Sequence, residues 1–201
     1  MKFGNSEKGL MLNKDEIINL CKLIVQDYPG WEFSAGAFKN KKELKHSVKI
    51  VDPTWSFSPG SALMQPVAGF LNKEAGKVIK HIYGEPFELT SWVRLESLNR
   101  DYVGGIRFYD IESDKAEDVI RQMFDEGLSV LDKYYDFSSE ENLLRSAPKN
   151  IEGQFGVQYC IMMAILGDYD FVRKYRSNEI KTDIPKLMNR IDEVMRYFNI
   201  V

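Results

Sequence analysis

Residues 106–135 read IRFYDIESDKAEDVIRQMFDEGLSVLDKYY, and the spacing of the apolar residues changes within this stretch. Ile106-Arg107-Phe108 alternates apolar and polar residues, as a half-buried strand does. From Ala116 onward, apolar residues recur every three to four positions, which indicates a helix with one buried side. Alternating runs such as Val48-Lys49-Ile50 occur only before the change. The sequence therefore predicts an α+β fold, with a strand-rich part over about 1–110 and a helical part over about 111–201.

The strand-rich part is expected to open with a helix that begins at Asn13, because Glu16 follows three residues later as in a capping box. The alternating runs predict a mostly antiparallel sheet of five to six strands, at about 31–38, 46–51, 54–58, 61–69, 88–97 and 102–110. One helix, over about 73–83, is inserted among them, with Asn72 as its cap and Gly84 at its end.

Three further features of the sequence predict how these strands are arranged. Pro66 lacks a backbone N–H, so the strand at 61–69 is predicted at a sheet edge. The last two strands are predicted to form an antiparallel hairpin. Gly104-Gly105 predicts a bulge, or the close approach of another backbone segment.

The helical part is predicted to contain four to five helices, at about 113–135, from Ser138-Ser139 to before Pro148, at 154–166, from Asp168 to about Tyr175, and at 184–198. The helix at 154–166 is apolar on nearly every side, so it is expected at the centre. Asp183 is the predicted cap of the last helix, with Pro185 in its first turn. No internal repeat or low-complexity linker divides the chain, which predicts a single α+β domain over residues 1–201.

The composition limits the classes of partner. The 201 residues carry a net charge of −3 with a pI near 5.6, so a nucleic-acid-binding protein is not expected. The longest apolar run, from Cys160 to Leu166, is too short to span a membrane. Residues 1–12 hold no apolar run of signal-peptide length, and Cys21 and Cys160 suit a reducing compartment. A cytoplasmic protein is therefore predicted.

The motifs of the common enzyme classes are absent from the sequence: there is no H-E-x-x-H, C-x-x-C, EF-hand loop or G-x-S-x-G. Asp110, Glu112 and Asp114 are candidates for a metal or acid–base group, but residues two apart share a face only on a strand, and the strand ends there. Acidic residues also favour the positive N-terminus of a helix. We therefore predict a non-enzymatic protein with no catalytic residue, no cofactor and no metal site.

Negative charge is concentrated in residues 110–141, which contain eleven acidic and three basic residues, a local net charge of −8. One interpretation is a solvated helix face. The other is a docking surface, since complementary charge accelerates association and fixes the register of a complex. Asp114, Asp118, Asp125 and Asp132 follow a near-heptad spacing, which places them along one stripe of the helix. The candidate partner-binding residues are Asp114, Glu117, Asp118, Asp125, Glu126 and Asp132.

Two other functions stay open. Aromatic residues on the strands could line a groove for a small molecule or peptide; they are Trp31, Trp55, Trp92, Tyr102 and Phe108. A hydrolase is possible if the fold brings together scattered residues such as His46, His81 and Glu96.

Two stretches resemble known proteins. Gly30-Trp31-Glu32-Phe33 through Gly36-Ala37-Phe38, followed by a lysine-rich turn, resembles the strand opening of small uncharacterised bacterial α+β proteins. The stretch from Met162 to Phe171, MMAILGDYDF, is similar to the helix–turn–helix of helical repeats and to the C-terminal ends of bacterial immunity-type proteins. This resemblance implies a cytosolic antidote that binds a basic toxin domain and blocks its active site. It implies no catalytic residues.

Overall fold

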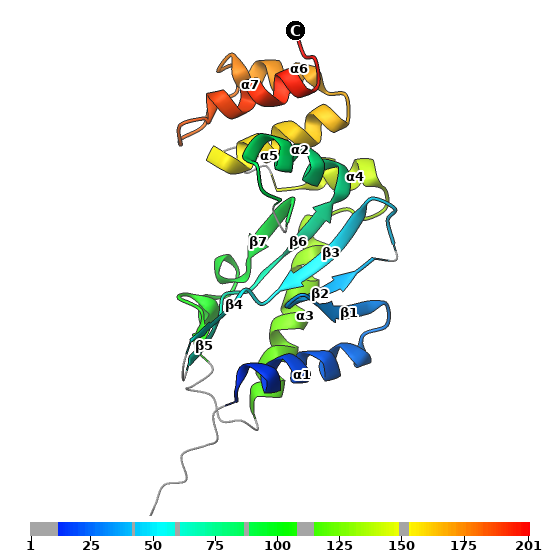
Figure 1. Cartoon of the computed structure of the whole chain (residues 1–201), viewed down its shortest axis with the longest axis vertical. Helices are drawn as coiled ribbons and strands as arrows, with labels where there is room; N and C mark the ends of the chain where they lie inside the picture. Colours follow the sequence, from blue (N-terminus) through cyan, green and yellow to red (C-terminus); the bar gives the residue numbers. More distant parts are fainter. Residues whose placement is uncertain (1–11, 42, 59–60, 87–88, 108–114, 149–152) are drawn as a thin grey trace, which may run out of the picture. The chain divides into compact units, whose positions relative to one another are not determined.

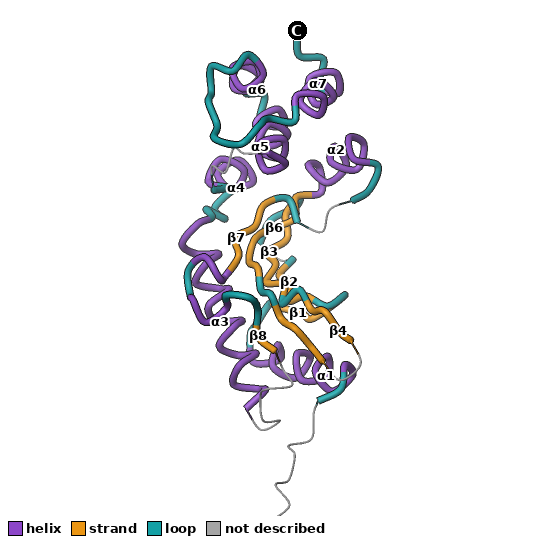
Figure 2. The backbone as a smooth tube through the Cα atoms, turned by 90° about the vertical axis from the view of Figure 1, so that its left-hand side faces the viewer, coloured by secondary structure: helices purple, strands orange, loops and turns teal. Residues whose placement is uncertain are grey.

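The computed structural model describes residues 12–41, 43–58, 61–86, 89–107, 115–148 and 153–201 (Figure 1). Among these residues, the strands all precede residue 108 and the chain from 116 onward is helical with connecting loops (Figure 2). The predicted α+β fold class, with its change from strands to helices, is therefore confirmed.

The described strands form two sheets, with the orders β1-β2-β3-β6-β7 and β4-β5-β8. They are β1 (Trp31–Ser34), β2 (Ala37–Asn40), β3 (Ser47–Asp52), β4 (Trp55–Ser58), β5 (Ser61–Met64), β6 (Val67–Asn72), β7 (Ser91–Arg94) and β8 (Ile106–Arg107). In the smaller sheet, β5 pairs antiparallel with β4, with Trp55 opposite Met64, and antiparallel with β8, with Leu63 opposite Arg107.

The helices agree with the predicted number and order. They are α1 (Lys14–Ile24), α2 (Lys73–Tyr83), α3 (Ala116–Tyr134), α4 (Glu140–Ser146), α5 (Gly153–Ile165), α6 (Tyr169–Arg176) and α7 (Met188–Tyr197). Two predicted helix starts are confirmed by their caps. Asn13 Oδ1 accepts from the N–H of Glu16 at 3.0 Å, and the Glu16 carboxylate accepts from the N–H of Asn13 at 2.7 Å. Asn72 Oδ1 accepts from the first-turn N–H groups of α2.

The contacts of the chain divide it into two compact units. The first comprises Met1–Lys39, Val51–Val67 and Arg94–Ser129, and the second comprises Asn40–Ile50, Ala68–Val93 and Val130–Val201. The single domain expected from the sequence stays a prediction, and each unit is described by itself below.

The core of the first unit is built around Phe124, which is fully buried on α3. Tyr28 and Trp31 meet its ring edge-on, with centroids at 4.5 and 5.1 Å, and Phe38 stacks on it at 4.4 Å. Such aromatic contacts add to the area that the rings bury, so this cluster anchors the inner side of α3.

The core of the second unit is centred on α5, which contacts α2, α4, α6 and α7. Most of its residues from Val157 to Ala164 are almost fully buried. The prediction of a central helix over about 154–166 is therefore confirmed.

The predicted hairpin of residues 88–97 and 102–110 is wrong within the described residues. β7 belongs to the five-stranded sheet, whereas β8 pairs with β5 in the other sheet. The chain between them is diverted by 3₁₀ turns at Leu95–Ser97 and Arg100–Tyr102, and Asn99 stabilises the second by accepting from the N–H of Asp101. The close approach predicted at Gly104-Gly105 is confirmed, since a Cβ on Gly105 would lie 2.8 Å from the carbonyl oxygen of Met64.

The single edge strand predicted at 61–69 is also wrong. The chain forms two strands, β5 and β6, on either side of Gln65-Pro66, and β6 lies between β3 and β7 in the larger sheet. Pro66 still contributes a carbonyl, which accepts from the N–H of Leu95 at 3.0 Å. Proline has no backbone N–H. Its position between two strands, and not within one, therefore leaves neither strand without a hydrogen-bond donor.

The last helix begins later than predicted. α7 starts at Met188, and its preceding residue, Leu187, provides no side-chain cap, so Asp183 does not cap this helix. The Lys186 ammonium group instead donates to the carbonyl oxygens of Tyr175 and Ile180. These bonds hold residues 178–187 as a loop and delay the start of the helix.

Candidate functional site

The outer side of α3 carries the candidate partner-binding residues. In the first unit, Ala116, Ile120 and Met123 on the inner side are buried, because the apolar residues repeat at helical spacing. Glu117, Asp118 and Asp125 are exposed, and Glu126 is half-buried. Asp132, in the part of α3 that belongs to the second unit, is also exposed. Asp114 lies outside the described residues.

A further acidic residue joins this group from outside the helix. Arg121 Nη2 lies 2.8 Å from Asp27 Oδ2 and 2.8 Å from Glu117 Oε1. The bonds to Asp27 and Glu117 raise the pKa of the Arg121 guanidinium above its already high value. Asp27 was not predicted, because it lies in a 3₁₀ turn about 90 residues before α3. We call Asp27, Glu117, Asp118 and Asp125 the acidic surface.

Asp125 is linked to the rest of the first unit through Tyr28. The Tyr28 hydroxyl donates to Asp125 Oδ1 at 2.8 Å. Burial and this hydrogen bond both raise the pKa of Tyr28, so the hydroxyl keeps its proton and remains a donor. The carboxylate of Asp125 is thereby held in a defined position while the residue stays exposed.

Glu126 differs from the other acids because its carboxylate is occupied within the unit. Asn99 Nδ2 donates to it at 3.2 Å and Gln122 Nε2 at 2.9 Å. Burial raises the pKa of Tyr102, and a hydrogen bond to Glu126 raises it further. Glu126 therefore links the 3₁₀ turn at Arg100–Tyr102 to α3. Its carboxylate has few acceptor positions left for another molecule.

Glu140, at the end of the acidic run, is also used inside its own unit. Its carboxylate accepts from the N–H of His46, from Ser47 Oγ at 2.6 Å and from Asn72 Nδ2 at 3.3 Å. Ser47 and Asn72 are almost fully buried. Because these bonds join the first residue of α4 to β3 and to the cap of α2, Glu140 is a structural residue of the second unit.

Each of the residues considered for hydrolysis has a different neighbour within its own unit. His46 Nδ1 lies 3.9 Å from Glu74 Oε1, which is longer than a hydrogen bond, and both side chains are about 40% exposed. His81 faces the ring of Tyr197, and Glu96 pairs with Arg94.

The cysteines are equally unsuited to nucleophilic catalysis. Burial raises the pKa of Cys21 to about 12 and also raises that of Cys160, so both thiols stay protonated at neutral pH. Within the described part of the chain, no three His, Cys, Asp or Glu side chains are placed to hold a metal ion.

The strand aromatics enter separate packing clusters. Trp31 packs on Phe124, Trp92 on Phe155, and Trp55 stacks on Phe57. Tyr102 is 3% exposed. Phe108 lies outside the described residues. Each of the four that are described is therefore at least half-buried and packs within its own unit.

Comparisons of the chain with models of known protein families, with curated protein sequences and with solved structures found no match. Over the described ranges, no helix has both the length and the hydrophobicity that a membrane span requires. No known protein therefore indicates a role for the acidic surface.

Proposed function

We propose that this chain is a non-enzymatic, protein-binding protein of the bacterial cytoplasm that acts as an immunity protein. In this proposal, the acidic surface and its continuation along α3 bind a basic toxin domain and neutralise it. The supporting observation is the arrangement of Asp27, Glu117, Asp118 and Asp125 in the first unit, where one arginine, Arg121, is shared between two of these acids. Uncompensated negative charge of this kind attracts and orients a cationic partner.

The surrounding bonds rank the contributions of the individual acids. Asp118 is exposed and has no hydrogen bond or ion pair within the described residues, so its whole carboxylate is available to a partner. Asp125 has one oxygen engaged by Tyr28. We therefore expect Asp118 and Asp125 to contribute most to binding, and Glu126 to act through the stability of the unit.

The first experiment is an affinity capture from the source bacterium, including its secreted fraction, followed by mass spectrometry. The proposal predicts stoichiometric retention of a basic toxin domain. Co-expression of the chain should then rescue cells from that toxin. A captured protein that is neither basic nor toxic, or a toxin that remains active in the complex, would contradict the proposal.

Charge reversal then tests the position of the surface. We expect Asp118→Lys combined with Asp125→Lys to weaken binding of the captured toxin domain at least tenfold at low salt, with only a small fall in the unfolding midpoint from the loss of the Tyr28–Asp125 hydrogen bond. The matched control reverses two exposed acids of the second unit, Glu85→Lys and Asp183→Lys, and has the same net charge. Equal affinity of the double variant and the control would refute this placement. Asp132→Lys tests separately whether the contact extends to the C-terminal part of α3.

A further inference from the structure

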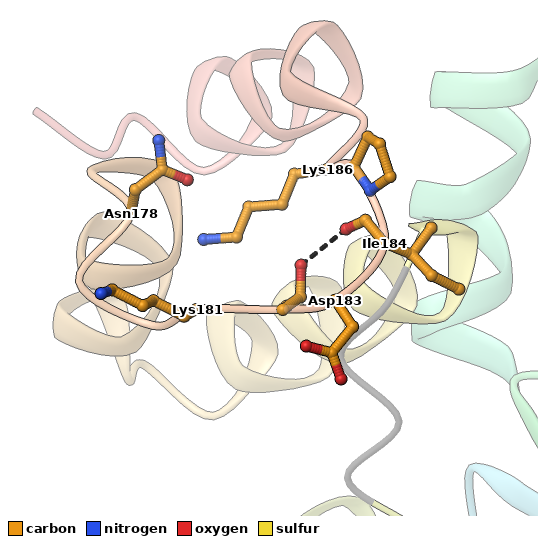
Figure 3. Close-up of a pocket in the computed structure, with 7 residues that line it drawn as sticks. Asn178, Lys181, Asp183, Ile184 and Lys186 are labelled. Carbon is orange, nitrogen blue, oxygen red and sulfur yellow. Dashed lines mark hydrogen bonds between the residues drawn. The ribbon is translucent and has the colours of Figure 1, made fainter.

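The loop between α6 and α7 borders an open pocket of about 410 Å³, lined by Asn178 and by residues 181–186 (Figure 3). Its position is set by Lys186, which follows Pro185 and turns its side chain into the loop. The Lys186 ammonium donates to the carbonyl oxygen of Tyr175 at 2.6 Å and to that of Ile180. It also lies 4.2 Å from the centroid of the Tyr175 ring. Hydrogen bonds within the second unit therefore hold the loop that forms the pocket.

The ammonium group keeps an unused donor. A lysine ammonium has three N–H groups, and two of those of Lys186 are taken by the carbonyl oxygens. Figure 3 shows the ammonium ending inside the loop, on the side where Asn178 and Lys181 lie. The third N–H is thus available to a molecule that enters the pocket.

The charge of Lys186 has no counter-ion in the part of the chain that the structure describes. Among the described residues no carboxylate pairs with it, and Figure 3 shows the Asp183 carboxylate directed away from it. Burial lowers the pKa of Lys186, which reflects the cost of withdrawing this cation from water. Lys181, on the rim, adds a second positive charge. A partly buried cation without a partner is stabilised when an anion pairs with it.

We infer that the 178–186 pocket binds a small oxyanion, the phosphate or carboxylate group of a small molecule, between Lys186 and Lys181. The Asn178 amide, at the same side of the loop, can donate a further hydrogen bond. The volume lies within the range of small-molecule sites, so the pocket admits more than a bare ion. This site belongs to the second unit and is independent of the proposed toxin-binding function.

The experiment is a titration of the full chain with inorganic phosphate and, separately, with citrate, followed by two-dimensional amide NMR. Sodium chloride holds the ionic strength constant, so that general screening does not change. We expect saturable shifts confined to the amides of residues 175–187. Saturation by phosphate alone assigns a phosphoryl ligand, and saturation by both assigns a general oxyanion site. Shifts that are absent, or that rise linearly across lysines of the whole surface, overturn the inference.

Three variants locate the site. Lys186→Met should weaken phosphate binding at least tenfold, and Lys181→Met at least threefold. Lys80→Met removes the same charge from an exposed position on α2 and should bind like the wild type. If Lys186→Met disorders the loop, which its own spectrum would reveal, Lys181→Met decides. Affinity equal to that of Lys80→Met then refutes the site.

Discussion

At the scale of single residues, Gln158 is the least expected feature of the molecule. It lies on α5 with 2% of its surface exposed, and neither its side-chain oxygen nor its nitrogen has a hydrogen-bond partner among the described residues. Its helix neighbours Val157, Ile161 and Met162 are buried and apolar. An amide left without partners in such surroundings costs about 1–3 kcal/mol of folding free energy.

We therefore expect Gln158→Met, which keeps the length of the side chain and removes the amide, to raise the free energy of unfolding by about 1–2 kcal/mol. Urea denaturation followed by circular dichroism measures this change. Gln26→Met replaces an exposed glutamine in the same way and should have almost no effect. A loss of stability in Gln158→Met alone would show that a water molecule or another group satisfies the amide.

At the scale of elements, two glycines of the second unit have opposite roles. Gly69 on β6 faces the backbone of β7, and a Cβ there would lie 2.0 Å from the carbonyl oxygen of Ser91 and 2.7 Å from Cα of Trp92. Gly76 on α2 has open space, with the nearest atom, Leu71 Cδ1, at 3.8 Å. The close approach of β6 and β7 requires glycine at position 69, whereas Gly76 only lowers the helix propensity of α2.

Alanine substitution should separate the two roles. Gly69→Ala forces β6 and β7 apart and should lower the free energy of unfolding by about 3 kcal/mol. Gly76→Ala should raise it by about 1 kcal/mol, since alanine is the better helix former. Thermal and urea unfolding of both variants measure the difference. Equal effects of the two substitutions would be inconsistent with the close packing of Gly69.

The same scale shows what local sequence patterns can predict. The starts of α1 and α2 were predictable because each depends on a cap within a few residues, Asn13 with Glu16 and Asn72 with its first turn. The start of α7 was not predictable from local patterns. The Lys186 ammonium donates to the carbonyl groups of Tyr175 and Ile180, and the spacing of apolar residues gives no information about such bonds. The pairing of β8 with β5 joins positions more than 40 residues apart, such as Leu63 and Arg107.

At the scale of the whole molecule, the sequence predicts where negative charge is concentrated. It does not predict which of the acidic side chains are hydrogen-bonded within the fold. The count of acids in residues 110–141 treats Glu126, Asp118 and Glu140 alike. The structure separates them, because Glu126 is bonded to Asn99 and Gln122, Glu140 to Ser47, and Asp118 to no described residue. Asp27 joins the group only through Arg121. Except for Gln122, these partners are distant in sequence. The acidic face of the helix could therefore be predicted, but not which of its carboxylates have hydrogen-bond partners within the fold.

The proposed function predicts how association with the toxin domain depends on salt concentration. Residues 101–201 hold 13 basic and 19 acidic residues, against 14 and 11 in residues 1–100, so the negative charge lies in the half that contains α3. Long-range attraction between this half and a basic toxin domain would accelerate encounter, and salt screens that attraction over about 10 Å at 0.1 M. The association rate constant should therefore fall at least tenfold between about 0.05 and 0.5 M sodium chloride, with a much smaller change in the dissociation rate. Surface plasmon resonance with the captured toxin domain measures both rates. In the Asp118→Lys, Asp125→Lys variant the salt dependence of association should be reduced, while an association rate that is independent of salt in the unmodified chain would rule out electrostatic steering.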